Sequence, residues 1–205
     1  MSQENNIERR TFTCELNKEL RKENPESRQV VGYASVFNSL SENLGGFKEK
    51  IDRNAFDGVM EDDVRALFNH DPNYILGRTL SNTLKLSVDD NGLRYEFDAP
   101  DTTFGNDLLV SLERGDVSQS SFGFIVEEDN WEKDDSGAVI RTIQKVSRLL
   151  DVSPVTYPAY PEASVGKRNF LNYKTELEKI ENDKQQKDLI KRNLLERKLK
   201  LIKNK

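Results

Sequence analysis

Apolar and polar residues alternate in several short segments of the first 160 residues, which is the pattern of strands with one buried face. Phe12, Cys14 and Leu16 begin this alternation, and QVVGYASVF at residues 29–37 and RALFN at 65–69 read as further strands, the latter ending at His70. The clearest pair is TLKLSVD and LRYEFDA, which flank an Asp-Asn-Gly turn and predict a β-hairpin. In that hairpin, the residues expected to face inward are Leu84, Leu86 and Val88.

A second hairpin is predicted between residues 115 and 152. The segment GDVSQSSFGF at 115–124 begins its first strand, the polar DNWEKDDSGA at 129–138 forms a long connection, and VIRTIQKVSRLLDV returns. The strand periodicity is replaced by a helical one at residues 101–114, where the apolar stripe is Leu108, Leu109 and Leu112. Asp101 or Thr102 would cap that helix, and Gly115 would end it.

Two further segments have helical features. RNAFDGVM at residues 53–60 predicts a short helix against the sheet. The stretch from about Lys174 to Lys203 contains no proline or glycine and predicts a longer helix. The chain is therefore expected to be mainly β with a few helices, an α+β fold. Closure of the sheet into a small antiparallel barrel would remove its exposed edges.

The charge of the chain divides it into two parts. Residues 167–205 contain 13 Lys and Arg and 6 Asp and Glu, a net charge of +7. Because the whole chain has a net charge of −5, residues 1–166 have a net charge of −12. We therefore expect a domain at 1–166 and a basic helical tail at 167–205. The apolar stripe of the predicted tail helix is interrupted at residues 183–187. This interruption favours an amphipathic helix that docks on a partner over a long coiled coil. The alternative is a tail that is merely solvated. Nucleic-acid binding is not favoured, because no aromatic residues accompany the positive charge.

Composition narrows the chemistry available to the chain. With a single cysteine, Cys14, and a single histidine, His70, neither an internal disulfide nor a Cys/His zinc site can form. We expect no cofactor, and reactions that use oxygen nucleophiles or carboxylates. No apolar run approaches the roughly 20 residues that span a bilayer, and the polar N-terminus does not resemble a signal peptide, so the protein is expected to be soluble and intracellular.

The candidate nucleophile is Ser121. In a strand, Ser120 shares one face with Phe122 and Phe124, whereas Ser121 shares the other face with Gly123, which would leave room for a substrate backbone. Taken alone, Ser121 also fits a polar residue on a half-buried sheet, and His70 fits a histidine bonded into a turn at a strand end. The spacing of these residues does not decide between the two interpretations.

Several motifs together resemble the prohead protease family of tailed bacteriophages, distant relatives of the herpesvirus assembly proteases. They cover about 135 residues and occur in the family's order: GYASVFN (32–38), NAFD (54–57), FNHDPNYILGRT (68–79), LERGDVSQSSFGF (112–124) and LLDVSPVTYPAYPEASV (149–165). The resemblance implies a closed antiparallel β-barrel of the herpesvirus-assemblin type.

The resemblance also implies a serine endopeptidase with Ser121 as nucleophile and His70 as base. The third member falls on Asp151, where the family more often has glutamate; Asp71 is the competitor, although neighbours on a strand point apart. Apart from the resemblance, backbone N–H groups could form an oxyanion hole, and Arg78 or Arg148 could help only if the fold brings them near; both also fit surface arginines.

The implied biological role is cleavage of the scaffold, often a domain fused to the major capsid protein, inside the procapsid in the host cytoplasm. Autoproteolysis would follow, and self-association into homo-oligomers is a further expectation to test. Two alternatives from other classes remain open. The first is a non-enzymatic assembly factor with an idle Ser/His pair, and the second is a hydrolase that uses paired carboxylates, for which no spaced motif stands out.

Overall fold

The computed structural model of the chain describes residues 7–13, 26–157 and 165–203. Cys14 and Leu16, which belong to the first predicted strand, lie outside these ranges. The chain divides into two compact units, residues 1–166 and 167–205. Each unit is described by itself below.

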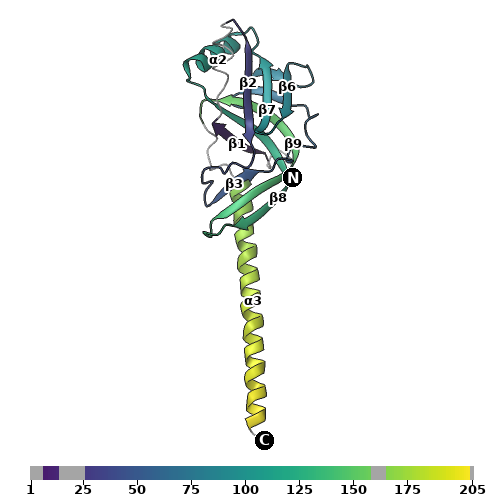
Figure 1. Cartoon of the computed structure of the whole chain (residues 1–205), viewed down its shortest axis with the longest axis vertical. Helices are drawn as coiled ribbons and strands as arrows, with labels where there is room; N and C mark the ends of the chain where they lie inside the picture. Colours follow the sequence, from purple (N-terminus) through teal and green to yellow (C-terminus); the bar gives the residue numbers. More distant parts are fainter. Residues whose placement is uncertain (1–6, 14–25, 158–164, 204–205) are drawn as a thin grey trace. The chain divides into compact units, whose positions relative to one another are not determined.

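The described part of the first unit is mainly β and contains two sheets (Figure 1). The larger sheet has the strand order β1-β8-β9-β4-β5, with β3 paired to another stretch of β9, and the smaller sheet has the order β2-β7-β6. Figure 1 shows β2, β7 and β6 side by side and the long β8 and β9 strands as a curved ribbon. The bounds are β1 (Glu8–Thr13), β2 (Gln29–Val36), β3 (Phe47–Ile51), β4 (Arg65–Phe68), β5 (Asp71–Arg78), β6 (Leu84–Val88), β7 (Gly92–Asp98), β8 (Gln119–Lys133) and β9 (Val139–Val155).

Among the residues that the structure describes, neither sheet is closed, so the predicted closed antiparallel β-barrel is wrong. The larger sheet is also mixed, because β3 and β4 both run parallel to β9. Its two end strands are poor templates for further pairing: β1 is short and carries three consecutive charges, and β5 contains Pro72 and register shifts against β4. Short, charged or proline-containing edges resist pairing, so the core is enclosed by packing of the two sheets instead of by a continuous ring of hydrogen bonds.

The core lies between the sheets and draws on both. Tyr95 and Phe97 of β7 and Phe122 and Phe124 of β8 are all buried, and the rings of Phe122 and Phe124 stack with centroids 4.5 Å apart. The β8 strand runs to Lys133, so only residues near 134–138 make the connection that was predicted to be longer. Register shifts between β8 and β9 bend this hairpin around the core.

The predicted helix at 101–114 is α2 (Thr103–Arg114). The Thr102 hydroxyl accepts a hydrogen bond from the Gly105 N–H at 3.2 Å, which satisfies a free donor of the first turn. Gly115 ends the helix at φ 80°, a left-handed conformation that glycine adopts without a steric penalty. The buried stripe includes all three predicted leucines, so this helix is confirmed in both extent and orientation.

Two local predictions need correction. RNAFDGVM forms consecutive turns in place of a helix, although Ala55, Phe56 and Val59 within it are buried. The β6–β7 hairpin is confirmed, but of its three residues expected to face inward Leu84 is buried whereas Val88 is 38% exposed. Leu86, between them, is partly buried against the core, and β6 lies at the edge of the smaller sheet.

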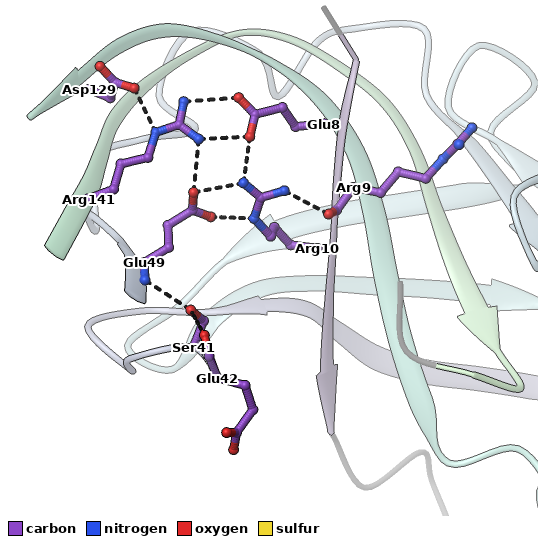
Figure 2. A network of polar contacts seen from close by, with 8 residues as sticks. All are labelled: Glu8, Arg9, Arg10, Ser41, Glu42, Glu49, Asp129 and Arg141. Atoms are coloured by element: carbon purple, nitrogen blue, oxygen red, sulfur yellow. Dashed lines mark hydrogen bonds and ion pairs between the residues drawn. The ribbon is translucent and has the colours of Figure 1, made fainter. Parts of the chain in front are cut away.

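A network of buried charges attaches β1 to the rest of the larger sheet (Figure 2). Arg10 of β1 donates to Glu49 of β3 at 2.6 and 2.8 Å, and Arg141 of β9 donates to Glu8 at 2.7 and 2.9 Å and to Asp129 at 2.6 Å. Burial alone would raise the pKa of Glu8, but hydrogen bonding and charge from Arg141 and Arg10 lower it below its ordinary value. These contacts join β1 to β3 and β9, while backbone pairing of β1 with β8 places Thr11 opposite Ser121.

Helix α3 spans Val165–Lys203, and the second unit begins at Lys167, so the described part of that unit is entirely helical. Every charged side chain between Lys174 and Arg192 is exposed, and so are Ile180, Leu189 and Ile190. None of the helices in the described ranges is apolar over a length sufficient to cross a bilayer.

Candidate active site

The pairing of β8 with β9 brings four of the relevant residues onto one face. Ser121 lies opposite Ser153, and Gly123 lies opposite Asp151, so these positions form two adjacent cross-strand pairs. Ser120, on the other face, is fully buried, and its hydroxyl is 2.6 Å from the Tyr95 hydroxyl. The predicted division of Ser120 and Ser121 between opposite faces is therefore confirmed.

His70 reaches this face from the turn between β4 and β5. Because β4 runs beside β9, with Ala66 opposite Val152, the turn that follows β4 lies next to the end of β9. Asn69 fastens the turn there: its N–H donates to the Pro154 carbonyl at 3.0 Å, and its Oδ1 accepts from the Thr156 N–H at 2.9 Å. Asn69 and His70 have φ values of 56° and 59°, in the left-handed region that asparagine and histidine enter more readily than most residues. The prediction placed His70 at the end of the strand. In the structure β4 ends at Phe68, and His70 lies in the sharp turn that follows.

The His70 ring bridges Ser121 and Asp151. Nε2 lies 2.6 Å from the Ser121 Oγ, and Nδ1 lies 2.5 Å from the Asp151 Oδ1. A carboxylate only accepts hydrogen bonds, so Nδ1 carries the proton in this pair and Nε2 is free to accept the proton of the serine hydroxyl. This arrangement can activate an oxygen nucleophile and stabilise the imidazolium that forms when the proton is transferred.

Gly123 has a different role from the one predicted for it. A Cβ atom at this position would lie 2.4 Å from the Asp151 Oδ2, so the carboxylate occupies the space that the glycine leaves. The bare backbone therefore serves the Asp151 side chain, which crosses over it to reach His70, and does not provide room for a substrate.

We expect Gly123→Ala to lower turnover by about 10²-fold, because the new methyl group must push the Asp151 carboxylate away from His70. Steady-state assays of the endopeptidase activity that the sequence resemblance implies would measure the loss. Gly58→Ala is the matched control, since nothing lies within 4 Å of the Cβ it would add. In an Asp151→Asn background, Gly123→Ala should cost far less, because both changes damage the same contact. Equal losses in the two backgrounds would contradict this explanation.

The other predicted candidates lie elsewhere. The Asp71 Oδ1 accepts hydrogen bonds from the Asn73 backbone and side chain, at 2.8 and 2.9 Å, and so belongs to its own turn. Arg78 pairs with Asp63 at 2.7 Å, and this hydrogen bonding lowers the pKa of Asp63 to about 2. Arg148 is exposed. In the part of the chain that the structure describes, no three His, Cys, Asp or Glu side chains gather in a way that could hold a metal ion.

Two contributors were missed from the sequence. Ser153 donates to the Asp151 Oδ1 at 2.8 Å, and Asn69 anchors the turn that carries His70. Strand alternation could have indicated Ser153, because residues two apart share a face and Asp151 was already a candidate. Asn69 offered no comparable signal, since its partners are 85 or more positions away in the sequence.

Comparison with known proteins gives one match. The family model described as caudovirus prohead serine protease matches residues 15–182, which is most of the chain and includes Ser121, His70 and Asp151. Neither the curated proteins nor the solved structures contain a significant match. The motifs around these residues and the extent of the family match agree, and the chain therefore belongs to the caudovirus prohead serine protease family.

Proposed function

We propose that this protein is a serine endopeptidase of capsid maturation that uses Ser121 as nucleophile, His70 as general base and acid, and Asp151 as the residue that orients His70. The observation that carries the proposal is the continuous hydrogen-bonded path from the Ser121 Oγ through both ring nitrogens of His70 to the Asp151 Oδ1, with distances of 2.6 and 2.5 Å. Such a path meets the geometric requirement for a nucleophile, a base and an orienting group in sequence.

In the first half of the reaction the Ser121 Oγ attacks the scissile carbonyl carbon while the His70 Nε2 takes the hydroxyl proton. The carbonyl π electrons move to oxygen, and their return expels the amine, which receives the proton from Nε2; an ester to Ser121 remains. Water then attacks the ester carbonyl while the His70 Nε2 takes a water proton; the bond to the Ser121 Oγ breaks, Oγ receives that proton, and the acid product leaves. Asp151 accepts the Nδ1–H bond throughout and stabilises the imidazolium in both halves.

The substrate that fits this family is the scaffold or a scaffold domain of the major capsid protein, cut inside the procapsid in the host cell, with cleavage of the enzyme itself as a second reaction. The membership of the chain in a prohead protease family supports this substrate class. Confinement within a procapsid would bring enzyme and scaffold together at high local concentration, which lowers the affinity that recognition requires.

Co-expression with the major capsid protein of the same virus tests the proposal. The capsid subunit recovered from assembled shells is expected to have a lower mass, with one new terminus, when this protein is present, and its full mass when it is absent. Shells that assemble normally around a full-length subunit in the presence of the protein would favour the non-enzymatic assembly factor.

We further propose that the basic tail, residues 167–205, docks the enzyme on an acidic surface of the assembling shell or scaffold. Its net charge of +7 is opposite to the −12 of the domain, and the charged side chains of α3 are exposed between Lys174 and Arg192. Reversing three of these charges together, at Lys184, Lys187 and Lys191, should leave peptide cleavage in solution within about twofold and reduce incorporation into procapsids about tenfold.

Quantitative immunoblotting of purified procapsids would measure incorporation in that experiment. Lys→Arg substitution at the same three positions is the matched control, because it preserves the charge. Unchanged packaging of the charge-reversed protein would show that the tail does not act through its charge.

A further inference from the structure

Ser153 is a buried hydroxyl that the acyl-transfer steps above do not use. The residue is 0% exposed and lies directly opposite Ser121 in the β8–β9 pair. Its Oγ is 2.8 Å from the Asp151 Oδ1 and 3.3 Å from the His70 Nδ1. It therefore touches both members of the His–Asp pair from the side of β9.

The direction of these bonds follows from the available protons. The Nδ1 proton of His70 points to the carboxylate in the shorter contact, so Nδ1 cannot accept a hydrogen bond from Ser153. The Ser153 proton must then go to the Asp151 Oδ1, which accepts two hydrogen bonds, one from the histidine and one from the serine. The other carboxylate oxygen, Oδ2, lies over Gly123.

Two donors on one oxygen restrict the rotation of the carboxylate. The torsion about the Cβ–Cγ bond of an aspartate is broad and nearly two-fold, so a single hydrogen bond leaves the group free to turn. With Ser153 donating from β9 and Gly123 leaving space for Oδ2, only one orientation keeps Oδ1 directed at His70. The hydroxyl is attached to a central strand, where its own position is fixed by the sheet.

We propose that Ser153 is a positioning residue that holds the Asp151 carboxylate in the orientation in which it binds the His70 Nδ1 proton. The inference rests on the proposed function for its kinetic consequences, but the contact itself exists whether or not the chain is an active enzyme. It adds a fourth member, on β9, to the hydrogen-bonded path that begins at Ser121.

Substitution at position 153 tests the kinetic part. Ser153→Ala is expected to lower kcat about tenfold with KM within about twofold, because the lost bond orients a group that acts on the reaction and does not touch substrate. Ser153→Thr and Ser153→Val form a matched pair, since the two side chains have nearly the same shape and differ in the hydroxyl. The threonine variant should retain most of the activity, and the valine variant should lose at least as much as alanine.

The chain's single histidine allows a second measurement that needs no turnover. In a proton NMR spectrum of the full chain, the Nδ1 proton of His70 is the one imidazole proton held by a carboxylate. Its exchange with water should be on the order of tenfold faster in Ser153→Ala than in the parent chain, because a freely turning carboxylate protects it less.

The outcomes separate the two proposals. Faster exchange with a fall in kcat, or faster exchange in a chain that cleaves nothing, supports the role of Ser153. Parent-like exchange together with parent-like kcat in Ser153→Ala overturns it and leaves the proposed protease function intact. Equal impairment of the threonine and valine variants with unchanged exchange in Ser153→Ala also overturns it, because the loss would then come from the added bulk.

Discussion

Ser121→Ala is expected to leave the capsid subunit at full length in shells that still assemble, with peptide cleavage reduced by about 10⁶-fold. Loss of the Oγ removes the atom that lies 2.6 Å from the His70 Nε2 and that forms the ester with the substrate in the proposed reaction. His70→Ala should cause a comparable loss, and the double substitution should add almost nothing, because the residues act as a unit. Mass spectrometry of the subunit and single-turnover peptide assays would measure both effects.

Ser120→Ala is the control for this prediction. Its hydroxyl contacts the Tyr95 hydroxyl in the core, so the substitution should cost about 1 kcal/mol of unfolding free energy and leave turnover within a few fold. Normal trimming of the capsid subunit by Ser121→Ala would remove this serine from the mechanism. If Ser120→Ala lost cleavage activity while Ser121→Ala remained fully active, the nucleophile would be Ser120.

Asp151→Asn is expected to lower kcat by about 10³-fold while KM changes little. An asparagine can present its NH₂ group to the His70 Nδ1, which would put the ring proton on Nε2 and leave that nitrogen unable to accept the Ser121 proton. The same change costs about 10⁴-fold in the serine-protease template, and we expect a smaller loss here, because the Asp151 side chain is one methylene shorter than the glutamate that the resemblance places at this position. Asp151→Glu should be tolerated, since the resemblance indicates that the family commonly carries glutamate there.

Asp71→Asn is the matched control for Asp151→Asn. The Asp71 side chain binds Asn73 in its own turn, so its amide should retain turnover within about twofold. The two variants can be compared by kcat and KM on one peptide. If Asp71→Asn strongly lowered kcat and Asp151→Asn did not, the orienting role would belong to Asp71. The roles of Ser121 and His70 would be unchanged.

The local pattern of apolar and polar residues predicted much of the β domain, because hairpins and helices depend on residues that are close together in the sequence. The β6–β7 hairpin follows from two alternating segments around one turn, and α2 follows from a leucine stripe between Thr102 and Gly115. The same alternation separated Ser120 from Ser121, since the side chains of neighbouring residues in a strand point to opposite faces. RNAFDGVM shows the limit of local pattern: Ala55, Phe56 and Val59 within it are buried, but the backbone turns repeatedly in place of forming a helix.

By itself, the sequence determined which residues could carry the chemistry, because the chain has one histidine and one serine motif of this kind on a strand face, and the family motifs indicated an acid at 151. Only the tertiary structure decided how those residues meet. The contacts depend on the pairing of β4 with β9, on a left-handed turn at Asn69 and His70, and on Gly123 making room for Asp151. Tertiary structure also determined that the sheets are open. A barrel closes only if the strands at opposite edges of the sheet can pair, and the periodicity of a single strand does not encode that pairing.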